Sequence, residues 1–98
     1  MLKISVVDGR SQRRVIVEGK LIAPWVAELR TACERARADL EDREFIVDLK
    51  NVTAINGEGE DALLELMKQR VKFRCGVFTE HFLKELTRRR RGSIQKPD

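Results

Sequence analysis

Four stretches of the chain have the apolar patterns that are typical of β-strands. Leu2 to Val7 alternates apolar and polar residues, which predicts a half-exposed strand. Val15 to Val17 predicts a second strand, antiparallel to the first. Phe45 to Leu49 is an almost unbroken apolar run, as in a strand that is buried on both faces. Val71 to Cys75 predicts a short fourth strand.

Between and after these strands, apolar residues recur every three or four positions, which predicts three helices. The first lies before Phe45, the second follows Gly59, and the third runs from Glu80 to about Arg88 with Thr79 as its N-cap. The residues that form the apolar faces are Val26, Leu29, Cys33, Ala36 and Leu40 in the first helix, Ala62, Leu63, Leu66 and Met67 in the second, and Phe82, Leu83 and Leu86 in the third.

The order of these elements predicts the architecture. A strand, a helix and a strand joined by short connections form a βαβ unit, whose two strands lie parallel. Two such units follow the first strand here. The sequence therefore predicts an α/β fold with a small mixed sheet of about four strands and three helices.

Composition limits the chain to one small domain. Its 98 residues are 42% hydrophobic, enough for a single core. Residues 88–98 hold Arg88 to Arg91 and Lys96 against Asp98, which accounts for the whole net charge of +4. Residues 1–87 therefore sum to zero charge. We expect a folded domain over residues 1–88 and a basic, disordered tail over residues 89–98.

The expected location is the cytoplasm. No apolar run approaches the length of a membrane span, and the segment from Met1 to Ile4 lacks the features of a signal peptide. Cys33 and Cys75 have no neighbours at metal-ligand spacing, so we expect free thiols in a reducing compartment.

The candidate site is a polar loop from Lys50 to Gly59, between the third strand and the second helix. In open α/β sheets, ligands and partners meet the fold at the carboxyl ends of strands. We expect Asn56 to be the helix N-cap and Thr53 to form a local backbone hydrogen bond. The two glycines, Gly57 and Gly59, allow a close approach of the backbone.

This region resembles the STAS domain, a family that includes bacterial anti-sigma-factor antagonists and the cytoplasmic ends of sulfate transporters. The family pattern is D-L-x-x-V-x-x-I-D-S-[ST]-G, followed by an apolar helix. The resemblance can be laid over residues 1–87 and is most specific at this core. The residues that match this pattern are Asp48, Leu49, Val52, Ile55 and Gly59, and the apolar Leu63 and Leu64 follow. Thr53, Asn56, Gly57 and Glu58 stand at the other positions of the motif.

The chain departs from the family pattern at the residue that matters for regulation. In phosphorylated members, the hydroxyl residue before the last glycine accepts the phosphate, and Glu58 stands there in this chain. Asn56 replaces the family's aspartate, and Gly57 replaces its serine. Glu58 either imitates the phosphorylated state or marks a scaffold that has taken another binding use.

The resemblance implies a non-enzymatic regulatory module that binds an anti-sigma, kinase-like or other regulatory protein through residues 50–67. It implies no cofactor and no metal, and the sequence itself has a single histidine, His81. The oligomeric state stays open. The partner-binding residues that we expect are Thr53, Asn56, Gly57, Glu58, Gly59, Asp61 and Leu64.

Two other readings remain. The module could bind a small ligand through the same loop, or nucleic acid through the arginine-rich tail. Nucleic acid is not favoured, because the domain itself is neutral and no aromatic residues interleave with the Arg88–Arg91 run. Trp25 is expected to plug the core and is less favoured as a partner anchor.

Overall fold

The computed structural model describes residues 1–69 and 71–95, and the side chains up to Arg88 apart from residue 70. Strands β1 (Leu2–Asp8) and β2 (Gln12–Leu21) pair antiparallel, as predicted. A turn joins them, in which the Gly9 N–H donates to the Gln12 carbonyl over 2.8 Å. Buried residues alternate with partly buried ones along most of β2, and Val15 and Val17 lie in the core.

Helix α1 (Val26–Ala38) crosses from β2 to strand β3 (Glu44–Ile55), and β2 and β3 are parallel. Its buried residues are the ones that the sequence pattern placed on one face, apart from Leu40, which is partly buried just beyond the helix. Trp25, the N-cap residue of α1, packs partly buried against the core, as expected of a core plug. The first predicted βαβ unit is therefore confirmed.

Strand β3 is longer than predicted. Phe45 to Leu49 is buried on both faces as expected, but the strand continues to Ile55 through the segment that we predicted to be a loop. The cause is pairing with β2, where Gly19 lies opposite Val52 and Leu21 lies opposite Ile55. The register of this pair shifts between Ile16 and Glu18 and between Gly19 and Lys20, as at a β-bulge or a similar irregularity.

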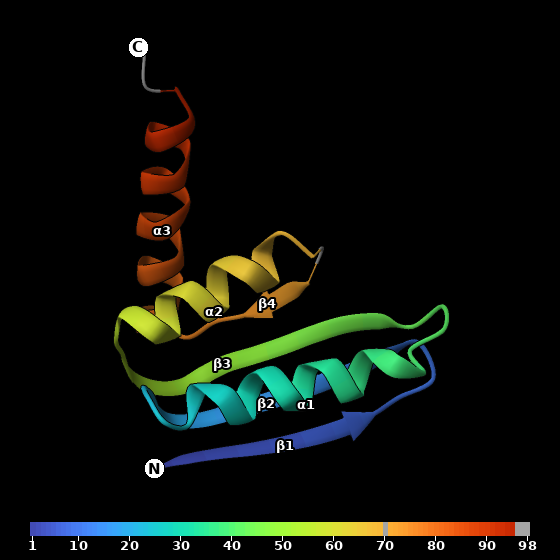
Figure 1. Cartoon of the computed structure of the whole chain (residues 1–98). Coiled ribbons are helices and arrows are strands. Elements are labelled where there is room, and N and C mark those ends of the chain that lie inside the picture. Colours follow the sequence, from blue (N-terminus) through green and yellow to red (C-terminus); the bar gives the residue numbers. More distant parts are fainter. Residues whose placement is uncertain (70, 96–98) are drawn as a thin grey trace.

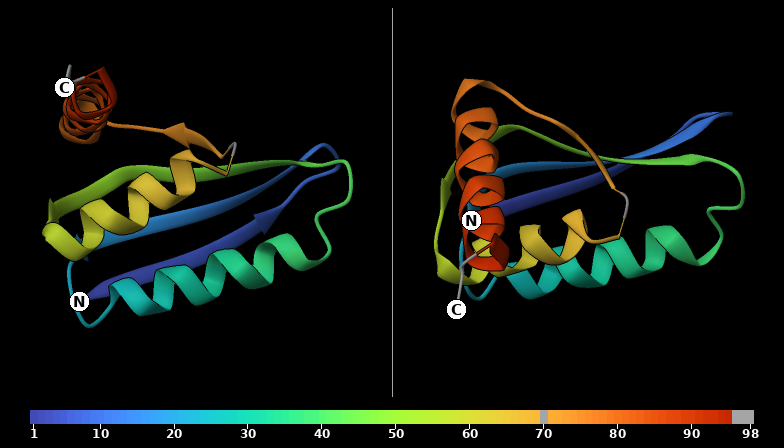
Figure 2. Two further views of the ribbon diagram at one scale, coloured as in Figure 1. Left: turned by 45° about the horizontal axis from the view of Figure 1, so that its top comes forward. Right: turned by 90° about the horizontal axis from the view of Figure 1, so that it is seen from above.

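Helix α2 (Gly57–Met67) and strand β4 (Lys72–Arg74) complete the second βαβ unit, with β4 parallel to β3. The mixed sheet has the order β1-β2-β3-β4. Helices α1 and α2 cover the same face of this sheet (Figure 2). They meet each other there, and Arg30 of α1 pairs with Glu65 of α2 over 2.6 Å.

Helix α3 (Val77–Gln95) begins earlier and ends later than predicted. Thr79 is therefore not the N-cap. Its buried hydroxyl lies inside the first turn and accepts a hydrogen bond from the Gly76 N–H over 3.0 Å. Leu83 and Leu86 join the core, while the far end of α3 projects from the body (Figure 1). The prediction for residues 96–98 lies outside the described part of the chain.

At the other end of the sheet, the side chain of Arg13 joins β1, β2 and α1. Its guanidinium bonds to Asp8 and Asp39, each over 2.5 Å, and to the carbonyl of Ala36 over 2.7 Å. The hydrogen bond from Arg13 lowers the pKa of Asp8, and likewise the pKa of Asp39. Arg13 is only 7% exposed, and these bonds satisfy a charge that burial alone would disfavour.

Candidate functional site

The candidate site lies where β2 and β3 end and where α1 and α2 begin (Figure 1). Leu21 and Ile55, the last residues of the two strands, are paired in the sheet. The N–H of Asn56 adds a further hydrogen bond to the Leu21 carbonyl over 3.3 Å. Sheet pairing therefore continues to the residue before the turn into α2.

Asn56 is the N-cap of α2, as predicted. Its backbone is extended, and its side-chain Oδ1 accepts a hydrogen bond from the Gly59 N–H over 3.0 Å. This bond satisfies one of the free donors in the first turn of the helix. Only Asn56 separates β3 from α2, so the site is a tight strand-to-helix turn and the predicted ten-residue loop is wrong.

The two glycines of the motif have different surroundings. A Cβ atom on Gly59 would overlap the Leu21 carbonyl oxygen and would lie 2.9 Å from Cγ2 of Ile55. A Cβ atom on Gly57 would meet no atom within 4 Å. The close approach at Gly59 is therefore made by this chain's own strand, whereas Gly57 leaves an open surface that a partner can reach.

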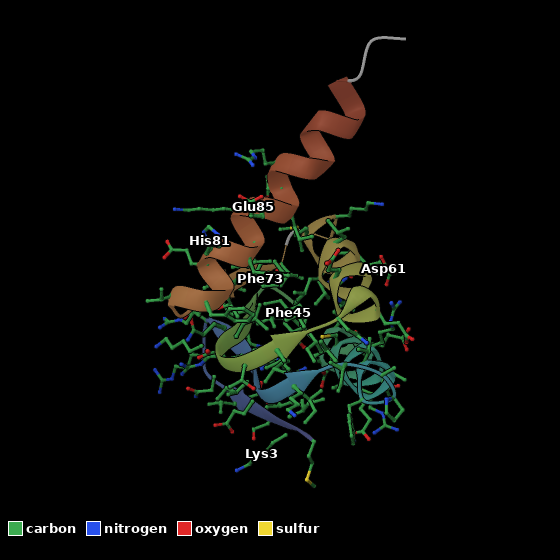
Figure 3. All side chains as sticks on the ribbon, turned by 90° about the vertical axis from the view of Figure 1, so that its left-hand side faces the viewer. Lys3, Phe45, Asp61, Phe73, His81 and Glu85 are labelled. Carbon is green, nitrogen blue, oxygen red and sulfur yellow. The ribbon has the colours of Figure 1, made fainter. Side chains whose placement is uncertain are left out.

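Glu58 is exposed beside this open surface, in the first turn of α2. Within residues 1–69 and 71–88, no side chain forms an ion pair with it. Glu60 lies in the same turn, and Asp61 is exposed and points outward in Figure 3. These carboxylates complement the positive end of the helix and repel a phosphate there.

Leu64 lies one turn further along α2 and is partly buried. It packs against the core, while its neighbour Leu63 is fully buried. From the sequence, Leu64 could be either exposed or partly buried. In the structure it is partly buried. Its remaining exposed surface continues the surface that begins at Gly57. Arg30 and Glu65, which the sequence did not single out, fix the adjacent parts of α1 and α2 through their ion pair.

Thr53 differs from its prediction in two ways. It lies in β3 instead of a loop, and its exposed hydroxyl donates to the Gly19 carbonyl of the neighbouring strand over 3.3 Å. This bond is not local, since Gly19 is far away in the sequence. The hydroxyl helps to hold the irregular register of β2 and β3, which is a structural role.

Other groups with chemical potential do not gather at this site. His81 is exposed on α3, on the opposite side from Asp61 in the view of Figure 3. In the described part of the chain, no three ligand-type residues are close enough to hold a metal ion. Cys33 and Cys75 are free thiols, and burial raises the pKa of Cys33 to about 11.

The sequence did not predict the exposed apolar start of α3. Val77 is 89% exposed and Phe78 is 48% exposed, and the ring of Phe78 lies against that of Phe82 with centroids 6.1 Å apart. This helix was predicted to begin at Glu80, so the helical spacing between Phe78 and Phe82 was not used. No described helix is long and apolar enough to cross a membrane.

No family model matches the chain, and no curated protein matches it either. The resemblance to STAS domains therefore stays a prediction that depends on the motif at residues 48–59.

Proposed function

We propose that this chain is a non-enzymatic interaction module that docks a regulatory protein through the start of α2. The observation that carries this proposal is the exposed carboxylate of Glu58, which pairs with none of the described side chains and lies next to the open surface at Gly57. Such an exposed charge can pair with a charge on another protein. Sheet pairing up to Ile55 and the Asn56 cap hold the backbone beneath it, which supports a surface that needs little ordering when a partner binds.

The chemistry of this surface favours a partner with a basic contact patch. Glu58 and Asp61 are exposed acids, and Leu64 adds a partly exposed apolar side chain. Complementary charges speed the encounter and select the partner, while apolar contacts at the centre contribute affinity. An anti-sigma or kinase-like protein is the partner class that the STAS resemblance suggests.

In this proposal, Glu58 supplies a constant negative charge where related proteins would carry a switchable one. A carboxylate has a charge of −1, whereas a phosphate carries about −1.5 to −2. Binding is therefore set by the residue itself and not by a kinase acting at position 58. Mass spectrometry of protein from its native host should find no phosphate in residues 50–67, and phosphate on Thr53 would contradict this part of the proposal.

Affinity capture from the native host tests the proposed docking surface. The baits are the wild-type chain, the double variant Glu58→Lys/Asp61→Lys, and Glu80→Lys as a control. Glu80 is also an exposed acid in the first turn of a helix, although it pairs with Lys84 over 3.9 Å, and it controls for charge reversal at a helix start outside the proposed surface. We expect a protein retained by the wild type and by Glu80→Lys but lost from the double variant. Equal capture by all baits, or capture of nucleic acid alone, would overturn the proposal.

A further inference from the structure

Strand β1 forms an open edge of the sheet, and nothing lies beyond it in Figure 1. Met1 and Lys20 lie opposite each other, and the Lys20 N–H donates to the Met1 carbonyl over 3.3 Å. In an antiparallel pair, the residues that bond to the neighbour alternate with residues that do not. The even-numbered residues, among them Ile4 and Val6, therefore turn their backbone N–H and C=O groups outward.

The same residues turn their side chains into a groove between β1 and α1. The groove has a volume of about 750 Å³, and Val6 in it is 50% exposed. On the helix side its lining includes the small residues Ala27, Thr31 and Ala32. The lining also includes charged side chains, among them Glu28 and Arg35. An edge with free backbone groups beside a groove of apolar and charged residues is suited to bind another strand.

We propose that a second copy of this chain occupies this edge, with the two β1 strands antiparallel about a two-fold axis at Ser5. Ile4 then pairs with the partner's Val6, and both exchange backbone hydrogen bonds. Lys3 lies opposite the partner's Val7, so this register avoids placing the two lysines face to face. A two-fold interface uses the same patch on both copies, and β1 is self-complementary in this way.

Charges on α1 support the same partner. Glu28 and Arg35 both line the groove and lie two helical turns apart on one face of α1. Neither forms an ion pair within the described side chains. The two-fold axis reverses the direction of the second α1, which brings Glu28 toward the partner's Arg35. The pair forms twice in the dimer, once on each side of the axis.

The dimer leaves the α2 surface free, because β1 is one edge of the sheet and α2 packs nearer the opposite edge, beside β3 and β4 (Figure 1). A dimer would therefore present two docking surfaces at once. The inference does not depend on the proposed function, since it concerns contacts between copies alone.

Sedimentation equilibrium of the purified full chain tests the dimer. We expect the wild type to approach twice its mass of 11.3 kDa as its concentration rises to about 1 mM. Glu28→Arg should raise the dimer dissociation constant by about tenfold or more, because it sets like charges opposite each other. The double variant Glu28→Arg/Arg35→Glu should restore the wild-type dissociation constant to within about threefold.

Val6→Pro tests the strand pairing. It removes an outward N–H, which an edge strand tolerates, and it should abolish the dimer while circular dichroism stays native. Should Val6→Pro fail to fold, the exposed charge variants still decide the question. Phe78→Ser, on the exposed start of α3, is the control and should dimerise normally. A wild type that stays monomeric, a failure of the charge reversal to restore dimerisation, or a dimer lost only in Phe78→Ser would overturn the proposal.

Discussion

Gly59 lies where the first turn of α2 passes closest to the end of β2. The sequence placed this glycine at the site, but the reason for it could not be read from the local pattern, because Leu21 is far away along the chain. Asn56 is the opposite case. Its role as N-cap depends only on residues next to it, and the prediction is confirmed.

Gly59→Ala should lower the free energy of unfolding by about 1–3 kcal/mol, because the new methyl group overlaps Leu21 and Ile55. Alanine favours a helix over glycine by about 1 kcal/mol, which offsets only part of this loss. Gly57→Ala is the matched control, with free space around the added atom, and should be unchanged or stabilised by up to about 1 kcal/mol. Urea unfolding measures both. Equal stability of the two variants would mean that the close approach at Gly59 does not exist.

The elements whose apolar residues recur at a regular helical or strand spacing were predicted best. Helices α1 and α2 bury the residues that their sequence patterns indicate, apart from Leu40 and Met67, which are partly buried. The end of β3 was missed, because its strand character comes from pairing with β2 and not from its own polar residues. Gly19, inside β2 with a φ of 107°, was the one sequence signal of an irregular strand here. The early start of α3 was missed because Val77 and Phe78 are exposed.

Alanine substitutions along α2 test which face of this helix is buried. Leu63 is 0% exposed and Leu66 is 7% exposed, so each change to alanine should cost about 2–5 kcal/mol of unfolding free energy. Leu64 is only partly buried, and Leu64→Ala should cost clearly less. Denaturant unfolding of the three variants gives the comparison. Similar costs at all three positions would show that the helix is rotated from the orientation described.

The network around Arg13 joins three elements and should make stability depend on acid pH. The hydrogen bond from Arg13 lowers the pKa of Asp8 and of Asp39 from 3.8 in the folded state. A lowered folded-state pKa stabilises the protein above the unfolded value, and this stabilisation is lost as the pH falls below about 3.8. Urea unfolding between about pH 6 and pH 3 should therefore show a steeper fall for the wild type than for Asp8→Asn. Parallel curves would mean that Asp8 is not held by Arg13.

For the whole molecule, the α/β class and the order of the elements follow from the sequence, because each strand and helix carries its own periodic signal. The exposed features could not be predicted in the same way. The groove along β1 and the apolar start of α3 depend on how elements pack, and a sequence pattern does not show which faces stay uncovered. These surfaces lie apart from the start of α2, so the proposed dimer would leave the proposed docking surface free.

The affinity of the captured partner for variants at position 58 tests the proposed function most directly. Isothermal titration calorimetry would compare the wild type, Glu58→Ser, Glu58→Lys and the control Glu80→Lys. We predict that Glu58→Lys weakens binding by about tenfold or more, with a smaller effect of Glu58→Ser, because the fixed negative charge contacts the partner. Glu80→Lys should bind like the wild type. If all four proteins bind equally, Glu58 is only a helix-capping charge, and the start of α2 is not the docking surface.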